Sequence, residues 1–168
     1  MCDPDYNAWT EDINPKPSGE KTNLRSAGCH IHIGYDNPNV ETSLQLIKLF
    51  DVYLGLASVV IDPDNKRRQL YGKAGAFRVQ DWGVEYRTLS SYMYSSDMLM
   101  HVIWMGILRV INAFNSQYHI PAPGVLIPTI NNSDYDEAIS YLNSMSRWSN
   151  KDKEFVDLVL SYQYKNKK

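Results

Sequence analysis

Alternating apolar and polar positions predict a β-strand within residues 24–35. Ile31 and Ile33 fall on one face of this strand, and His30 and His32 fall on the other. This is the period of two that a strand with one buried face requires. The segment therefore predicts a strand that buries its isoleucines and presents its imidazoles on the opposite side.

The same alternation predicts a second strand over residues 82–91, in which Glu85 and Arg87 share one face. Residues 67–80 predict a glycine-rich loop that enters a short strand at the sequence AFRV, residues 76–79. The positions of the second strand that point away from Glu85 are Val84, Tyr86 and Thr88.

Apolar residues that recur every three or four positions predict helices in the rest of the chain. Asn39 and Asp97 are suitable N-caps for the first two helices. Ser133 and Ser149 each begin a capping-box sequence with Asp in the last place. A proline-broken connector is expected over residues 119–128. The predicted helices span about 40–61, 98–116, 134–147 and 150–163.

Together these elements predict an α+β fold in which helices back an antiparallel β-sheet. Residues 1–23 are rich in Pro, Asp, Asn and Gly, which predicts an extended arm or loop. Residues 24–168 are expected to form a single α+β domain, because this length suffices for one hydrophobic core.

The composition changes this picture little, since 43% hydrophobic and 21% charged residues are ordinary for a soluble globular protein. A formal net charge of −2 argues against nucleic-acid binding, which needs clustered basic surface. The longest apolar run, residues 98–114, contains His101 and Arg109 and predicts a buried helix rather than a membrane span. With only Cys2 and Cys29 and no signal-like start, a cytoplasmic location is expected.

The polar faces of the two main strands carry the candidate chemistry. If both strands lie in one sheet with these faces aligned, His30, His32, Glu85 and Arg87 share one surface. Imidazole and carboxylate together suit Mn²⁺, Zn²⁺ or Mg²⁺. Side chains two apart on a strand are separated by roughly 6.5–7 Å, so one histidine would join Glu85 on an ion. The alternative is a polar sheet face held by ordinary hydrogen bonds and a structural Glu85–Arg87 salt bridge.

Arginines interleaved with glycines are the second signal. The guanidinium fork matches phosphate and carboxylate oxygens, which suits phosphoryl transfer beside a metal. The alternative, plain exposed surface, is strongest for Arg67, which follows the turn DPDNK. Arg78 and Arg87 lie within predicted strands, where an unpaired charge would be costly. The four arginines of this region are Arg67, Arg68, Arg78 and Arg87.

Two other chemistries are disfavoured. Cys29 and His30 are adjacent on a strand, so their side chains point to opposite faces and do not form a nucleophilic pair. The sequence GKAGAF lacks the spacing of a phosphate-binding P-loop.

Four ordered motifs, CDPDYNAWT, AGCHIHIGY, RRQLYGKAGAFR and WGVEYRTLSS, resemble the phage-type carboxylate–amine ligases. These are amidoligases of the superfamily that includes glutamine synthetase and glutamate–cysteine ligase. The resemblance covers about residues 2–91 and implies a partial glutamine synthetase-like catalytic fold, the C-terminal part of a ligase. In that superfamily ATP phosphorylates a carboxylate, and an amine attacks the acyl phosphate to form an amide. Mg²⁺ or Mn²⁺ holds the phosphates.

Position by position, the resemblance implies a metal site at His30 and Glu85. It implies that His32 and three arginines contact ATP and substrate, and that two of these arginines, Arg78 and Arg87, act in catalysis. The third arginine is Arg68.

The expected substrates are a small-molecule or peptide carboxylate and an amine. A separate chain that supplies an N-terminal half, a homo-oligomer and, for a phage-encoded protein, the host cytoplasm are further expectations. Two alternatives remain: a zinc-type metalloenzyme built on the His-x-His strand, and an inactive ligase remnant that acts in assembly.

Overall fold

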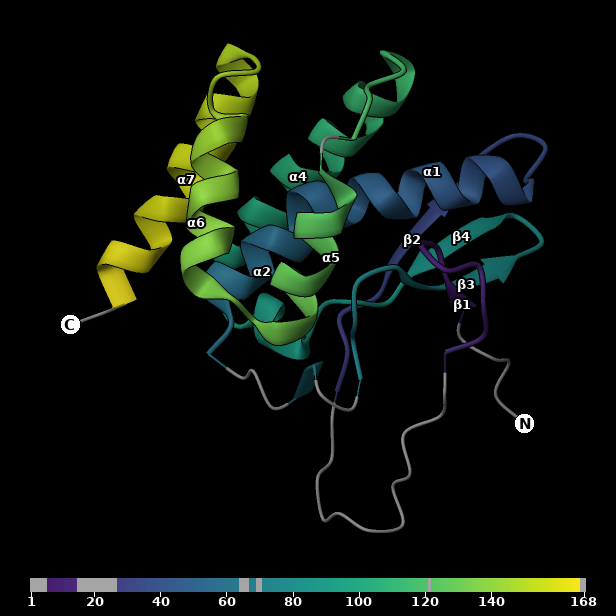
Figure 1. Cartoon of the computed structure of the whole chain (residues 1–168), viewed down its shortest axis with the longest axis horizontal. Helices are drawn as coiled ribbons and strands as arrows, with labels where there is room; N and C mark the ends of the chain where they lie inside the picture. Colours follow the sequence, from purple (N-terminus) through teal and green to yellow (C-terminus); the bar gives the residue numbers. More distant parts are fainter. Residues whose placement is uncertain (1–5, 15–26, 64–66, 69–70, 121, 167–168) are drawn as a thin grey trace, which may run out of the picture.

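The predicted antiparallel sheet is present in the computed structural model, which describes residues 6–14, 27–63, 67–68, 71–120 and 122–166. The four strands lie in the order β1-β3-β4-β2, and every pair is antiparallel. Helices lie to one side of this sheet, which confirms the α+β class (Figure 1). The finer expectation of a glutamine synthetase-like arrangement stays a prediction. The strands are β1 Tyr6–Asn7, β2 Ile31–Gly34, β3 Ala76–Gln80 and β4 Gly83–Tyr86.

Within the expected arm of residues 1–23, Tyr6 and Asn7 form the edge strand β1, paired with β3. A turn follows, and Ala8 is fully buried. The rest of that arm, apart from residues up to 14, lies outside the described residues, as does Cys2. The division into an arm and a single domain therefore stays a prediction.

The predicted helix over residues 40–61 is present and begins as expected. The Asn39 side chain accepts a hydrogen bond from the backbone N–H of Thr42. The helix is α1 Val40–Phe50, a π-helical segment η2 Asp51–Gly55, and α2 Leu56–Ile61. The wider π turn is an interruption that periodicity did not predict, and such turns are often found at functional sites.

Three predictions in the second half of the chain are corrected. Ser96, not Asp97, caps α4 (Asp97–Asn115), because its side chain accepts from the backbone N–H of Leu99. The connector predicted over 119–128 is instead partly helical, because α5 spans Pro123–Asn132. A proline can begin a helix because the backbone N–H at the first position has no hydrogen-bond partner within the helix.

Ser133 does not cap the next helix, because it adopts a left-handed conformation (φ 53°) that ends α5. Asp134 is the cap instead, and its side chain accepts from the N–H of Glu137. The capping box at Ser149 is confirmed in part, since the Ser149 hydroxyl accepts from the N–H of Asp152 at 3.0 Å. The remaining elements are η3 Ser91–Tyr94, α6 Tyr135–Met145 and α7 Asn150–Asn166.

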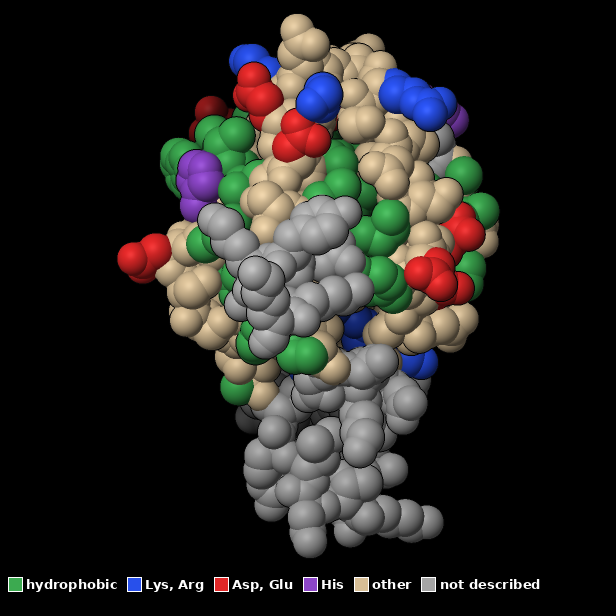
Figure 2. Space-filling model, turned by 90° about the vertical axis from the view of Figure 1, so that its left-hand side faces the viewer, with side chains coloured by type: hydrophobic (Ala, Val, Ile, Leu, Met, Phe, Trp, Pro, Cys, Tyr) green, Lys and Arg blue, Asp and Glu red, His purple; other side chains and the backbone are tan. Residues whose placement is uncertain are grey.

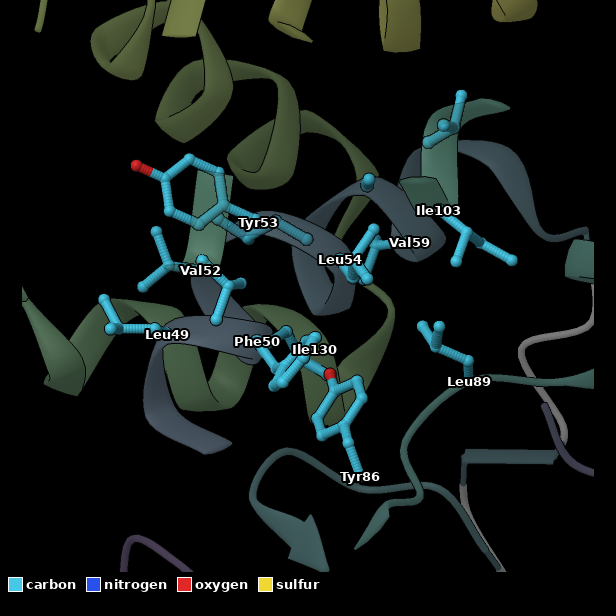
Figure 3. Packing of buried hydrophobic residues seen from close by; sticks show 14 of the residues in the cluster. Leu49, Phe50, Val52, Tyr53, Leu54, Val59, Tyr86, Leu89, Ile103 and Ile130 are labelled. Atoms are coloured by element: carbon cyan, nitrogen blue, oxygen red, sulfur yellow. The ribbon is translucent and has the colours of Figure 1, made fainter. Parts of the chain in front are cut away.

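The core lies between the helices and the inner face of the sheet. Phe50 of α1 stacks on Tyr86 of β4 with ring centroids 5.0 Å apart, and Ile130 of α5 lies beside them in an apolar cluster that also contains Ile103 of α4 (Figure 3). This confirms the predicted parity of β4, because Val84 and Tyr86 are fully buried on the helix side. Glu85, between them, must therefore face the other side of the sheet.

Two helical stretches, Val40–Ile61 and Asp97–Asn115, are long and apolar enough to span a membrane by length and composition alone. The first is mostly buried, and core helices of soluble proteins pass the same test. The second buries one face but leaves Trp104 58% exposed, so the prediction of a buried helix holds only for its inner side. Figure 2 shows acidic and basic side chains interspersed with apolar ones on one face of the helical part.

Two glycines provide a matched test of this packing. A Cβ at Gly106 of α4 would lie 2.2 Å from a methyl carbon of Leu54, whereas a Cβ at Gly124 of α5 would meet nothing within 4 Å. Gly106→Ala should therefore lower the free energy of unfolding by about 1–3 kcal/mol through overpacking. Gly124→Ala should leave it unchanged or raise it slightly. Urea unfolding of both variants measures the difference, and equal effects would contradict the packing described.

Candidate functional site

The strand register brings the predicted polar residues together on the sheet face that points away from the helices. Glu85 lies at the centre of β4, with His32 of β2 opposite it on one side and Arg78 of β3 opposite it on the other. His30 immediately precedes β2, and Arg87 immediately follows β4. The structure therefore confirms that the two strands lie in one sheet and present these polar residues on the same face.

These five side chains, the Glu85 cluster, contact one another through the central carboxylate. His30 Nδ1 lies 2.8 Å from Glu85 Oε1, and His32 Nε2 lies 3.9 Å from the same oxygen. Arg78 Nη1 lies 3.6 Å from Oε2. Arg87 donates from Nη1 to Oε1, and this nitrogen also lies 3.2 Å from His30 Nδ1. One carboxylate thus contacts two imidazoles and two guanidinium groups.

Exposure of the cluster increases from Glu85 towards the histidines. The side chain of Glu85 is 5% exposed, while those of His30 and His32 are 29% and 51% exposed. Burial by itself would raise the pKa of Glu85, but the charge and hydrogen bond of Arg87 outweigh it and hold this pKa below its ordinary value. The cluster therefore contains an ionised carboxylate at neutral pH.

Burial, followed by the charge of Arg87, lowers the pKa of His30. Its imidazole is consequently neutral at pH 7 and keeps a lone pair for an electrophile or metal. The ring packs closely on the chain, since a Cβ at Gly28 would lie 2.4 Å from His30 Nε2. Cys29 is fully buried whereas the His30 side chain is 29% exposed, which agrees with the predicted opposite faces, and burial raises the pKa of the Cys29 thiol.

Arg67 is not on the surface, which rules out the alternative that its place after a turn had favoured. Its side chain is buried and donates to the backbone carbonyls of Thr88 at 2.8 Å and Leu89 at 2.7 Å. The residue therefore holds the segment after β4 in place. Because this is a contact between distant parts of the chain, local turn chemistry gave no sign of it.

Arg68 is also buried, and its described hydrogen bond, 3.0 Å long, goes to Ser58 of α2. Ser58 lies on the helix side of the sheet, so the structure does not show Arg68 beside the Glu85 cluster. The phosphate or substrate role expected for Arg68 stays a prediction, as do the roles expected for the other site residues.

Tyr71 is a neighbour of the cluster that the sequence analysis missed. Its hydroxyl accepts a hydrogen bond from Arg87 Nη2, and its ring lies beneath the guanidinium groups of Arg67 and Arg87 at 5.1 and 5.7 Å. Tyr71 therefore helps to fix the direction of Arg87. It lies in the glycine-rich loop, where no periodicity marks a side chain as inward or outward.

Asp51 is a second residue that sequence reasoning missed. Its buried carboxylate accepts hydrogen bonds from Trp9 Nε1 at 2.7 Å, from the N–H of Gly75, and from the Tyr86 hydroxyl at 2.8 Å. Burial raises the pKa of Asp51 to about 7, although these hydrogen bonds oppose the shift. Asp51 thus ties the N-terminal turn, the glycine-rich loop and β4 to the π-helical segment.

The donors of the cluster fit a divalent cation in type and in part in geometry. An imidazole nitrogen and a carboxylate oxygen 2.8 Å apart have the separation of neighbouring ligands on one ion. Among the described residues no group of three or more His, Cys, Asp or Glu side chains gathers at such a point. Arg87 also lies against the same oxygen, so a cation at His30 and Glu85 requires this guanidinium to withdraw.

Comparison with known families matches this region. The model of the family described as "Phage phiEco32-like COOH.NH2 ligase-type 2" matches residues 12–122, which is more than half of the chain and includes the whole Glu85 cluster. Comparisons with curated proteins and with solved structures found no match. The match confirms the resemblance to carboxylate–amine ligases and covers three of the four motifs, since CDPDYNAWT ends before residue 12. The chain belongs to the phage phiEco32-like family of COOH.NH2 ligases, type 2.

Proposed function

We propose that the chain takes part in ATP-dependent joining of a carboxylate to an amine through an acyl phosphate, with the Glu85 cluster at the reaction centre. The main support for this proposal is the 2.8 Å contact between His30 Nδ1 and Glu85 Oε1, on a sheet face that also presents Arg78 and Arg87. The family match supports a carboxylate–amine ligase in general. The use of ATP and the acyl-phosphate intermediate go beyond this match and are part of the proposal.

In the proposed reaction, a carboxylate oxygen attacks the terminal phosphorus of ATP, and the bond from that phosphorus to ADP breaks. The amine nitrogen then attacks the acyl carbon, phosphate leaves with the electrons of its C–O bond, and the nitrogen loses a proton. Negative charge develops on the phosphoryl oxygens in the first step. Arg78 and Arg87 flank the Glu85 carboxylate, and their guanidinium groups are placed to stabilise such charge.

His30 and Glu85 would hold a divalent cation, which when bound neutralises phosphate charge and aligns the triphosphate. For this to happen, Arg87 leaves Glu85 Oε1 and turns towards the incoming anion. Tyr71 is placed to guide this movement, because its hydroxyl accepts from the other nitrogen of the same guanidinium group. In this account Arg87 neutralises Glu85 only while the cation is absent.

The test is to incubate the chain, together with any adjacently encoded chain, with ATP, Mg²⁺ and a library of amino acids, and to measure ADP release. ADP release that depends on both a carboxylate and an amine is expected. His30→Ala should remove it, whereas His119→Ala, a change outside the cluster, should not. No ADP release by a correctly folded chain under any of these conditions would contradict the proposal.

One observation favours the remnant alternative as a second candidate. The Glu85 carboxylate is already paired with Arg87, as expected for a structural ion pair. Titration with Mn²⁺ and ATP distinguishes the ligase from the inactive remnant. Binding that is lost in His30→Ala and Glu85→Ala supports the ligase, whereas absence of both metal and nucleotide binding in wild type and variants supports the remnant.

A further inference from the structure

An exposed aromatic pair lies at the end of the sheet next to the Glu85 cluster. Trp82 occupies the turn between β3 and β4, and its indole stacks on the His32 imidazole with ring centroids 5.4 Å apart and an interplanar angle of 18°. Trp82 is nevertheless 45% exposed. A large flat apolar surface is thus held in a fixed orientation while much of it faces solvent.

The turn that carries Trp82 lies close against β2. A Cβ on Gly83, which has a φ of 155°, would lie 1.9 Å from the carbonyl oxygen of Ile33. A Cβ on Gly34 would make only ordinary contact, 3.9 Å from Cε3 of Trp82, so the indole lies next to this position of β2. The tight pairing of Gly34 with Gly83 therefore fixes the turn that carries Trp82.

The pair is continuous with the charged cluster. His32, on which the indole stacks, has its Nε2 3.9 Å from Glu85 Oε1, and Arg78 lies on the far side of that carboxylate. Along one sheet face the order is therefore a stacking surface, an imidazole, and then the carboxylate with its guanidinium groups. A nucleotide has the matching order of a planar ring followed by charged phosphates.

We propose that the exposed face of the Trp82 indole is the stacking surface for the base of the nucleoside triphosphate, with His32 as the ring that holds the indole in place. This rests on the proposed ligase function, which requires a nucleotide at the Glu85 cluster. Every base has a π-face that stacks on tryptophan, so the contact adds affinity without selecting strongly among bases.

The test compares binding of ATP and of inorganic triphosphate to wild type, Trp82→Ala, Trp82→Phe and Trp104→Ala by calorimetry. Trp82→Ala should weaken ATP binding about tenfold and leave inorganic triphosphate unchanged, because only ATP carries a ring. Trp82→Phe should keep most of the affinity. Trp104, a tryptophan on α4 that is 58% exposed, is the control, and its substitution should change the binding of neither ligand.

Fluorescence gives a second, direct measurement, since a stacked base quenches an indole. ATP should quench wild type more than Trp82→Phe, and inorganic triphosphate should quench neither. Equal ATP affinity in wild type and Trp82→Ala, or equal weakening of both ligands, would overturn the inference. ATP binding that depends on Trp82 but is not followed by ADP release would support the stacking surface and contradict the ligase proposal. ADP release by a chain whose ATP binding does not depend on Trp82 would support the ligase proposal and overturn the stacking surface. No ATP binding by wild type would overturn both.

Discussion

Glu85→Gln is expected to lower carboxylate- and amine-dependent ADP release at least about 100-fold while the chain stays folded. The amide has almost the same shape but no charge, so it no longer attracts a divalent cation or balances the guanidinium groups of Arg78 and Arg87. Loss of a group that stabilises transition-state charge typically costs a factor of this size or more. The measurement is the initial rate of ADP release at saturating ATP.

Glu137→Gln, at an exposed position of α6, is the matched control and should keep full activity. Because an unbalanced buried charge also costs stability, thermal unfolding of Glu85→Gln must show that the variant is folded at the assay temperature. Glu85→Asp keeps the charge and should retain partial activity. Activity of a folded Glu85→Gln variant equal to that of wild type would show that the carboxylate is structural only.

Asp51→Ala is expected to lower the free energy of unfolding by about 3–6 kcal/mol, the second large effect. The substitution leaves two buried donors, the Gly75 N–H and the Tyr86 hydroxyl, and one partly buried donor, Trp9 Nε1, without this acceptor. Each unsatisfied buried group costs on the order of 1–3 kcal/mol. Chemical unfolding measures the change.

Asp51→Asn is the conservative control and should cost much less. Trp9 and Gly75 both donate to Oδ2, and Tyr86 meets Oδ1. An asparagine can therefore place its amide oxygen where Oδ2 accepts from Trp9 and Gly75, and its amide NH₂ where it donates to the hydroxyl oxygen of Tyr86. A loss of stability in Asp51→Asn as large as that in Asp51→Ala would contradict this hydrogen-bond arrangement.

The raised pKa of Asp51 gives a pH dependence with a definite sign. Its pKa is about 7 in the folded chain against an ordinary value of 3.8, so between these values the folded state holds a proton that the unfolded chain has released. The stability that this proton confers is complete below about pH 4 and is lost as pH rises through about 7. Wild type should therefore lose stability relative to Asp51→Asn between about pH 4 and pH 7, and a constant difference would contradict a titrating Asp51.

Period-two alternation was enough to predict which side chains of each strand share a face, and the pairing of the strands in one sheet then brings them together. Because parity along a strand is strict, the burial of Tyr86 obliges Glu85 to face the other way, and the alternation of His30 with Ile31 does the same for β2. The cap at Asn39 was predictable for a similar reason, since capping depends on residues three apart in the chain.

The features that sequence reasoning missed depend on contacts between distant segments. Arg67 is buried because it binds carbonyls 21 and 22 residues away, and Asp51 because donors from three segments converge on it. Ser133 was misassigned because its backbone is left-handed, which ends one helix and passes the capping position to Asp134. Local patterns carry no information on which segments meet.

The most direct test of the central claim is a crystal structure of the chain with Mn²⁺ and a non-hydrolysable ATP analogue, using the anomalous signal of manganese. The account predicts a manganese peak in contact with His30 and Glu85, Arg87 turned away from the Glu85 carboxylate, and the triphosphate beside Arg78 and Arg87. Manganese or triphosphate bound only on the helix side of the sheet, with the Glu85–Arg87 pair intact, would contradict it.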